Sequence, residues 1–278
     1  MGKKRALIVG LNYPNQSNFL RDSVNDSIRV KDMLITYYGF APNAVKLVVD
    51  AKGTMNTPPL NDFRIKKTTK QINDEYICKK LTKMIKKSSA GDTIFFYFAG
   101  HGGSTTTAFD NDTGQEEYMR CHGGTMIEDS AIRHLWQTVP EGCSFTFVAD
   151  CCKSGGLLEG AKEIVGHSKI GSTVSEKGLK PWNKVCKLGR PTNHPLGIFI
   201  SSCQANEDCR GGFCEERLEH SSFFSQAFLR VIEETRGNVT NLKLVQRITK
   251  LLENRPIETT PGLYCDDNQM KLMFLGSP

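Results

Sequence analysis

Two apolar segments of the sequence end in side chains that could carry out nucleophilic chemistry. The segment IFFYFAGHGG leads into His101, and the segment FTFVADCCKSGG leads into Asp150, Cys151 and Cys152. A cysteine attacks as its thiolate, and a neighbouring imidazole promotes loss of the thiol proton. If the two segments are neighbouring strands, their ends place an imidazole beside a thiol, as a cysteine nucleophile requires.

Glycines follow both segments and permit sharp turns. The N–H groups of Gly102 and Gly103, with that of Cys152, could face the negative oxygen that develops when a carbonyl is attacked. The ordinary alternative for a single cysteine at a strand end is a small buried hydrophobe, and a single histidine is more often a loop residue. Here both residue types stand at strand ends before glycine turns, which favours the catalytic interpretation.

The intervening residues predict the elements that position these side chains. Nearly continuous apolar runs, typical of strands covered on both faces, occur at 5–10, 44–49, 93–98, 145–149, 197–201 and 270–275. Segments with a helical apolar period occur at 24–38, 72–87, 129–138, 223–234 and 242–253. This alternation predicts an α/β fold with a mostly parallel, six-stranded sheet flanked by helices, in which function gathers at the carboxyl ends of the strands.

One segment breaks the alternation. Residues 160–195 are rich in Gly, Ser, Lys and Pro, show no sustained period and contain seven basic residues. We expect an exposed linker there, between a large segment, residues 1–159, and a small segment, residues 196–278, that completes the same domain.

Composition narrows the class of protein. The 278 residues carry a net charge of only +6, and no aromatic-interleaved basic stripe suggests a nucleic-acid partner. No run of about 18 apolar residues and no signal peptide is evident, so we expect a cytoplasmic monomer without a membrane partner. Ten cysteines in a reducing compartment indicate free thiols, and no CxxC pair suggests a zinc site.

With these motifs in this order, the chain resembles the metacaspases, which belong to the caspase-like clan of cysteine peptidases. FYFAGHGG and VADCCKSGG are similar to the histidine and cysteine motifs of that family, and IVGLNYP, ISSCQANE and ETTPGLYCDD are similar to its plant-type (type II) branch. The resemblance implies a caspase-like sandwich with p20-like and p10-like segments, endopeptidase activity after Arg or Lys, and a role in proteolysis or programmed cell death. It assigns the nucleophile to Cys152, the base to His101, and the oxyanion donors to Gly102 and Cys152.

The resemblance also assigns a pocket for the basic side chain that precedes the cleaved bond, the P1 residue. Asp26 and Asp150 match the two carboxylates that the family places there. A buried acidic pocket is physically suited to a guanidinium or ammonium group. Without the resemblance, Asp26 would be an acid in the first turn of a helix, where the helix dipole favours it. We expect protein or peptide substrates with basic residues.

Two further expectations follow from the resemblance. No cofactor is required for the chemistry, but calcium is common as an activator in the family, and a hard cation needs several converging oxygens. The positions that match its carboxylates are Glu116, Glu128, Asp129 and Glu159. A peptidase that cuts after basic residues also carries candidate autocleavage sites in its own linker, with Lys177 and Lys180 as the first choices.

Three positions depart from the family pattern. Lys153 stands where a histidine usually follows the nucleophile, Ala99 where a serine usually precedes Gly-His, and Cys151 where a serine is usual. They leave open a catalytically impaired metacaspase-like protein that acts by binding or inhibition. A flavodoxin-like nucleotide-binding domain is a further alternative, suggested by the loop LNYPNQSN, but the chain lacks a glycine-rich phosphate loop.

Overall fold

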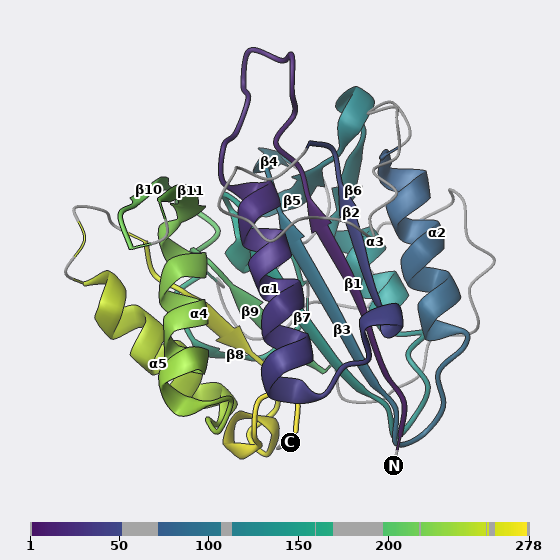
Figure 1. Ribbon diagram of the computed structural model, residues 1–278. Coiled ribbons are helices and arrows are strands. Elements are labelled where there is room, and N and C mark those ends of the chain that lie inside the picture. The colour runs from purple at the N-terminus through teal and green to yellow at the C-terminus, as the bar shows by residue number, and fades with distance from the viewer. Residues whose placement is uncertain are drawn as a thin grey trace.

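The computed structural model describes residues 2–51, 72–106, 113–158, 160–168, 197–216, 218–253, 255 and 259–276. A central sheet has the strand order β2-β1-β3-β7-β9-β12-β8 (Figure 1). Its strands are β1 (Lys4–Gly10), β2 (Val45–Val49), β3 (Thr93–Ala99), β7 (Ser144–Asp150), β8 (Glu163–Val165), β9 (Ile198–Ser201) and β12 (Gly262–Tyr264). The strands from β2 to β9 run parallel, and β12 is antiparallel to both of its neighbours. The predicted α/β fold with a mostly parallel sheet is confirmed.

The prediction of six strands, with the last at 270–275, is wrong. That stretch begins within a short 3-10 helix, Gln269–Lys271, and makes one isolated bridge, from Met273 to Thr240. Its apolar character has another cause, because Phe274 is fully buried and packs edge-on against Tyr38, Phe95 and Phe228. The sheet is completed instead by the short strands β12 and β8.

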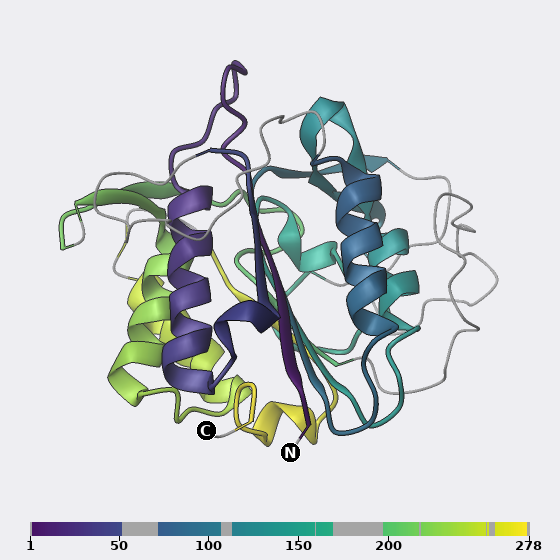
Figure 2. The same cartoon turned by 45° about the vertical axis from the view of Figure 1, so that its right-hand side comes forward.

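Helices cover both faces of the sheet, as Figures 1 and 2 show. One face carries α1 (Ser23–Tyr38), α4 (Phe223–Thr235) and α5 (Asn241–Leu252), and the other carries α2 (Asp74–Ile85) and α3 (Asp129–Trp136). Side chains along each strand alternate between two cores: in β1, Ala6 and Ile8 face one helical layer, while Leu7 and Val9 face the other. Strands buried on both faces explain the continuous apolar runs in the sequence.

Two small sheets lie at the carboxyl end of the central strands (Figure 1). One contains β4 (Gly102–Thr106), β5 (Gln115–Arg120) and β6 (Met126–Glu128), and the other is the hairpin β10 (Gly211–Cys214) with β11 (Glu219–Ser222). They surround the end of the sheet at which the sequence predicts function.

The stretch predicted as a linker, residues 160–195, begins with β8, which pairs with β12. From residue 169 onward it lies outside the described residues, and the candidate cleavage sites Lys177 and Lys180 lie there with it. Among the helices that the structure describes, none is long and apolar enough to cross a membrane.

Candidate active site

The register of two neighbouring strands brings the predicted nucleophile and base together. Strand β3 pairs with β7 so that Ala99 lies opposite Asp150. His101 lies two residues after Ala99, and Cys152 lies two residues after Asp150. Both line a cavity of about 150 Å³ at the end of the sheet. The imidazole and the thiol therefore share one site, as the sequence predicts.

The His101 side chain is oriented from the loop between β1 and α1. Its Nε2 lies 2.5 Å from the carbonyl oxygen of Asn18, and its ring stacks on Tyr13 with centroids 4.8 Å apart. A carbonyl can only accept, so Nε2 carries the hydrogen and Nδ1 is the basic nitrogen of the neutral ring. This tautomer leaves Nδ1 as the atom able to take a proton.

The Cys152 thiol is half-buried and contacts both backbone groups of Cys209, since its S–H donates to the Cys209 carbonyl at 3.8 Å. Its Sγ accepts a hydrogen bond from the N–H of Cys209 at 3.3 Å. Burial raises the pKa of the Cys152 thiol to about 11, and the Cys209 N–H only partly offsets this effect. The resting thiol is therefore protonated at neutral pH, and attack requires proton transfer to a base during the reaction.

The neighbouring thiol points elsewhere. Cys151 is buried in the core on the α2 and α3 side of the sheet, and burial raises the pKa of its thiol well above the usual value. The Cys151 carbonyl accepts hydrogen bonds from the thiols of Cys209, at 3.1 Å, and Cys203, at 3.3 Å. Only the second member of the doublet lines the cavity.

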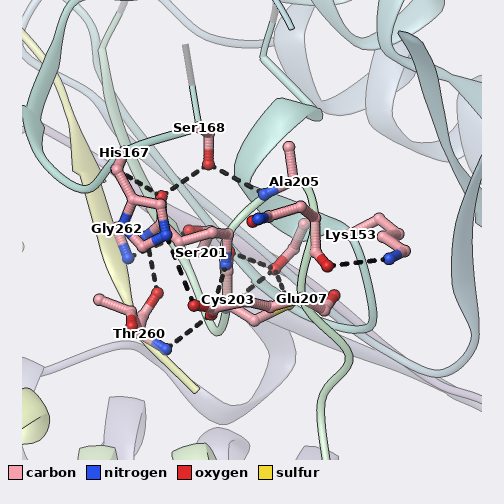
Figure 3. A network of polar contacts seen from close by, with 12 residues as sticks. Lys153, His167, Ser168, Ser201, Cys203, Ala205, Glu207, Thr260 and Gly262 are labelled. Carbon is pink, nitrogen blue, oxygen red and sulfur yellow. Dashed lines mark hydrogen bonds and ion pairs between the residues drawn. The ribbon is translucent and has the colours of Figure 1, made fainter. Parts of the chain in front are cut away.

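A polar network holds in place the loop that carries Cys209 and contacts Cys152 (Figure 3). The side-chain oxygen of Gln204 accepts from the N–H of His167 at 2.8 Å and from the Ser168 hydroxyl at 2.6 Å, while its amide donates to the carbonyl of Thr260 at 2.7 Å. The carboxylate of Glu207 accepts from the N–H groups of Gln204 and Thr260, at 3.0 and 2.8 Å. The small segment thus fixes one wall of the site.

Lys153 is part of this wall and is turned away from the cavity. It has a left-handed backbone, with φ of 58°, and its N–H donates to the Glu207 carbonyl at 3.0 Å. Its Nζ donates to the Asn206 carbonyl at 3.1 Å and lies 3.6 Å from the carboxylate of Asp208. The lysine that replaces the usual histidine therefore stabilises the loop and leaves the path to Cys152 open.

Asp26 and Asp150 line the same cavity and are both buried. Ser222 joins them: its N–H donates to Asp26 at 2.9 Å, and its hydroxyl donates to Asp150. Ser221 donates to Asp26 at 2.5 Å, and Ser225 donates to Asp150 at 2.6 Å. The hydroxyls that these carboxylates bind come from β11 and the first turn of α4, so the pocket is built across both segments of the chain.

Burial raises the pKa values of both carboxyl groups. The pKa of Asp150 rises to about 6, and that of Asp26 lies well above its usual value because of burial and then of its neighbour Asp150. The serine hydroxyls act in the opposite direction but do not compensate. An incoming cation would restore both charges by supplying the missing counter-ion.

Asp22 is a pocket residue that sequence reasoning missed. It lines the cavity at the start of α1, and a Cβ at Gly211 would lie 2.3 Å from its Oδ2, so glycine there lets the carboxylate approach. The signal was present, since Asp22 and Asp26 are four residues apart and lie on one side of a helix. Three carboxylates and one guanidinium, that of Arg210, therefore line the cavity, which is acidic on balance.

The predicted calcium ligands are only partly placed. Glu116 and Glu128 lie on one face of the β4–β5–β6 sheet, because Glu128 pairs with Tyr118. The two carboxylate oxygens of Asp129 accept from the N–H groups of Ser130, at 2.5 Å, and Glu117, at 3.3 Å. Glu159 lies outside the described residues. Within the described part, no group of three or more His, Cys, Asp or Glu side chains could hold a metal ion, so calcium binding stays a prediction.

Comparison with known families shows to which family this chain belongs. Residues 4–161, which contain both His101 and Cys152, match the family model for the metacaspase, peptidase C14 domain. The chain belongs to the metacaspase family. It is therefore a caspase-like cysteine peptidase by family, as the sequence motifs predict.

The relatives of this metacaspase include plant proteins. Metacaspase-9 of Arabidopsis thaliana is 27% identical over an alignment that covers 100% of this chain and 98% of the relative. Metacaspase-7 of the same plant is 35% identical over 59% of this chain, and the aligned part is only 38% of its length. The similarity therefore extends over the whole chain in one case and over less than half of the relative's length in the other.

Solved structures support the fold of the metacaspase. The protein GSU0716 from Geobacter sulfurreducens superposes with a TM-score of 0.64 at 16% identity over 99% of each chain. Caspase-1 from Spodoptera frugiperda superposes with a TM-score of 0.54 at 14% identity over 99% of this chain and 90% of its own. The predicted caspase-like fold is confirmed.

The raised pKa of Asp150 predicts that this metacaspase becomes more stable when the charge is removed. A pKa displaced from 3.8 to about 6 corresponds to about 3 kcal/mol of folding free energy lost above pH 6. Asp150→Asn should therefore raise the Tm at pH 7.5 by up to about 6 °C, and the gain should vanish towards pH 4, where the folded wild-type carboxyl is protonated. Thermal unfolding followed by circular dichroism measures both values.

Asp92→Asn is the matched control, with the opposite sign. The hydrogen bond from Arg5 lowers the pKa of Asp92 to about 2, so its carboxylate contributes stability at neutral pH that is lost in acid. Asp92→Asn should lower the Tm at pH 7.5. A Tm of Asp150→Asn at or below that of wild type would show that the hydroxyls already compensate for the burial of Asp150.

Proposed function

We propose that this metacaspase is an endopeptidase that hydrolyses peptide bonds after Arg or Lys, with Cys152 as nucleophile and His101 as base. The observation that carries the proposal is the cavity: the imidazole, the thiol and the carboxylates of Asp22, Asp26 and Asp150 line the same small space. A basic side chain that enters this space brings its carbonyl carbon beside the thiol. Proteolysis in the cytoplasm, including programmed cell death, is the corresponding cellular role.

The proposed reaction proceeds through an acyl-enzyme. As Cys152 Sγ attacks the carbonyl carbon of the P1 residue, Nδ1 of His101 takes the thiol proton, and the Asn18 carbonyl stabilises the resulting imidazolium through Nε2–H. His101 then gives the proton to the leaving amine, and the C–N bond breaks. Water, with His101 again as base, hydrolyses the thioester and regenerates the thiol.

Gly102 is suited to bind the oxyanion, for a reason that lies in the β4–β5 ladder. In an antiparallel ladder, hydrogen-bonded and non-hydrogen-bonded facing pairs alternate. The N–H of Arg120 donates to the His101 carbonyl, so the next facing pair, Gly102 and Met119, is a non-hydrogen-bonded one. The N–H of Gly102 is therefore directed away from β5 and is not used by the ladder. A Cβ at Gly102 would lie 2.1 Å from the Cys152 carbonyl, so only glycine brings this N–H so close to the nucleophile.

The alternative of an impaired protein that acts by binding or inhibition rests on Lys153, Ala99 and Cys151. The contacts of Lys153 with Asn206 and Asp208 argue against a block of the cleft by its cation. Ala99 and Cys151 are both buried at the ends of the paired strands, and neither position has a role in the proposed reaction. These observations favour the active enzyme, and turnover of peptides decides between the two proposals.

The cysteine doublet provides the first test. Cys152→Ala should abolish hydrolysis of fluorogenic peptides ending in Arg, whereas Cys151→Ala should retain most of it, because only the Cys152 thiol lines the cavity with His101. Thermal unfolding of both variants confirms that each is folded. A folded Cys151→Ala variant without activity, beside an active Cys152→Ala variant, would reverse the assignment.

The pocket provides a second test that is independent of the dyad. The ratio of kcat/KM for a P1 Arg peptide to that for its neutral isostere, P1 citrulline, should rise with pH through about 6 as Asp150 ionises, because only the cation gains from the charge. Asp26→Asn and Asp150→Asn should each lower kcat/KM for the P1 Arg peptide, because each raises its transition-state free energy by about 2–5 kcal/mol. A P1 Asp peptide should not be cleaved by wild type.

The control for the pocket variants is Asp267→Asn, which removes an exposed carboxylate paired with Lys162. It should leave the Arg-to-citrulline ratio unchanged. An equal ratio in wild type and in both pocket variants, or a wild type that prefers P1 Asp, would refute the basic specificity while leaving the dyad untouched.

Cleavage within the chain itself is the third test. An active enzyme specific for basic residues should cut the segment 160–195, with Lys177 and Lys180 as the proposed sites, because seven basic residues lie there. Intact mass spectrometry should show an N-terminal and a C-terminal fragment with ends at these sites for wild type, and one uncut chain for Cys152→Ala. Active wild type without any cut between Gly160 and Pro195 contradicts autoprocessing.

A further inference from the structure

Tyr13 occupies a position that its own backbone disfavours. It is fully buried, with φ of 53°, in the left-handed region that non-glycine residues rarely adopt. Its hydroxyl accepts from the N–H of His101 at 2.9 Å and donates to the carbonyl of Arg120 at 2.7 Å. Because burial raises the pKa of Tyr13 well above its usual value, the phenol stays protonated and can donate. Gly100 permits this approach, since a Cβ there would lie 2.7 Å from the phenol oxygen.

A buried carboxylate holds the backbone of Tyr13 in this conformation. Asp50, directly after the edge strand β2, accepts from the N–H of Asn12 at 2.8 Å and from the N–H of Tyr13 at 2.7 Å. The same carboxylate lies 2.6 Å from Nε2 of His122, and both side chains are almost completely buried. The Tyr13 ring lies between two imidazoles, stacked on His101 and tilted against His122 at 5.5 Å.

Through Asn12, the Asp50 carboxylate also fixes the base of the loop that carries Asn18. The carbonyl of Asn12 accepts from the N–H of Leu20 at 2.8 Å, and its side chain accepts from the N–H of Val24 at 3.1 Å. The loop therefore closes on Asn12, whose own N–H donates to Asp50. Both groups that orient the imidazole, the Tyr13 ring and the Asn18 carbonyl, are anchored through Asp50.

We propose that Tyr13, held by the buried Asp50–His122 pair, is a positioning residue for His101, and that the pair acts on the base only through Tyr13 and its loop. The inference rests on the proposed function, in which His101 takes the Cys152 proton. It goes beyond that function by assigning a role to three buried side chains that do not line the catalytic cavity. A small displacement of a catalytic group slows the chemical step more than it weakens substrate binding.

The test measures kcat and KM for the P1 Arg peptide, with active sites counted by an irreversible chloromethyl ketone ending in Arg. Tyr13→Phe keeps the ring and should lose about fivefold in kcat, whereas Tyr13→Leu loses ring and hydroxyl and should lose about 100-fold. Asp50→Asn and His122→Gln should each lose about tenfold. KM should change by less than about twofold throughout, because the pocket carboxylates are untouched.

Tyr38→Phe is the matched control, since it also removes a buried tyrosine hydroxyl, bonded to the Gly237 carbonyl at the far end of α1. It should keep the wild-type kcat. A merely structural role for Tyr13 would lower the fraction of titratable sites but leave kcat per site unchanged. A kcat per site within twofold of wild type for Tyr13→Leu and Asp50→Asn overturns the proposal.

A second readout separates failure of this inference from failure of the proposed function. If wild type cleaves no peptide, the proposed function fails, but alkylation of Cys152 by iodoacetamide still reports how well His101 accepts the thiol proton. Peptide mapping should show Cys152 alkylated about tenfold more slowly in Tyr13→Leu than in wild type, with Cys143 as the internal reference. Equal Cys152 rates in the two proteins reject the positioning role.

Discussion

The parallel pairing of β3 with β7 is the constraint on which the rest of the site depends. Seven residues of each strand face each other from Thr93 and Ser144 to Ala99 and Asp150, with no irregularity. Because side chains alternate between the two faces, a slip of one residue would move a whole strand's apolar set to the wrong core. Burial of both faces therefore fixes the register, and the register fixes the two reactive groups two residues beyond it.

Everything else at the site is supplied by parts of the chain that are distant in sequence. The loop after β1 orients His101, and the loop around Glu207 brings the Cys209 N–H to Cys152. The start of α1 provides acids, and β11 and α4 provide the hydroxyls. Burial raises the pKa values of Asp26, in α1, and of Asp150, at the end of β7, so the charged forms of both carboxyl groups reduce folding stability. In the function that we propose, the same two buried charges would provide the specificity for a basic side chain.

The strands and helices with a clear apolar period could be predicted from the sequence. The meeting of His101 and Cys152 in one cavity could also be predicted, because reactive residues at strand ends are a local signal. It could not reveal β12 and β8, which are three residues each and are defined by their pairing rather than by their composition. The run at 270–275 has the composition of a strand but does not pair as one. Its apolar Phe274 packs in the core and belongs to no ladder of strand hydrogen bonds. Asp50, His122 and the orientation of Lys153 depend on contacts across 50 residues or more, which no local pattern specifies.

The placement of β9 has a consequence for a chain that has been nicked between its two segments. Strand β9 lies between β7 of the large segment and β12, and the rings of Phe147 and Phe199 stack across the junction at 4.9 Å. Loss of one peptide bond removes a tether but none of these contacts, so the two fragments remain a single folded particle with a continuous sheet. A chain cut there would therefore be a heterodimer whose two parts are joined by the strands of one sheet.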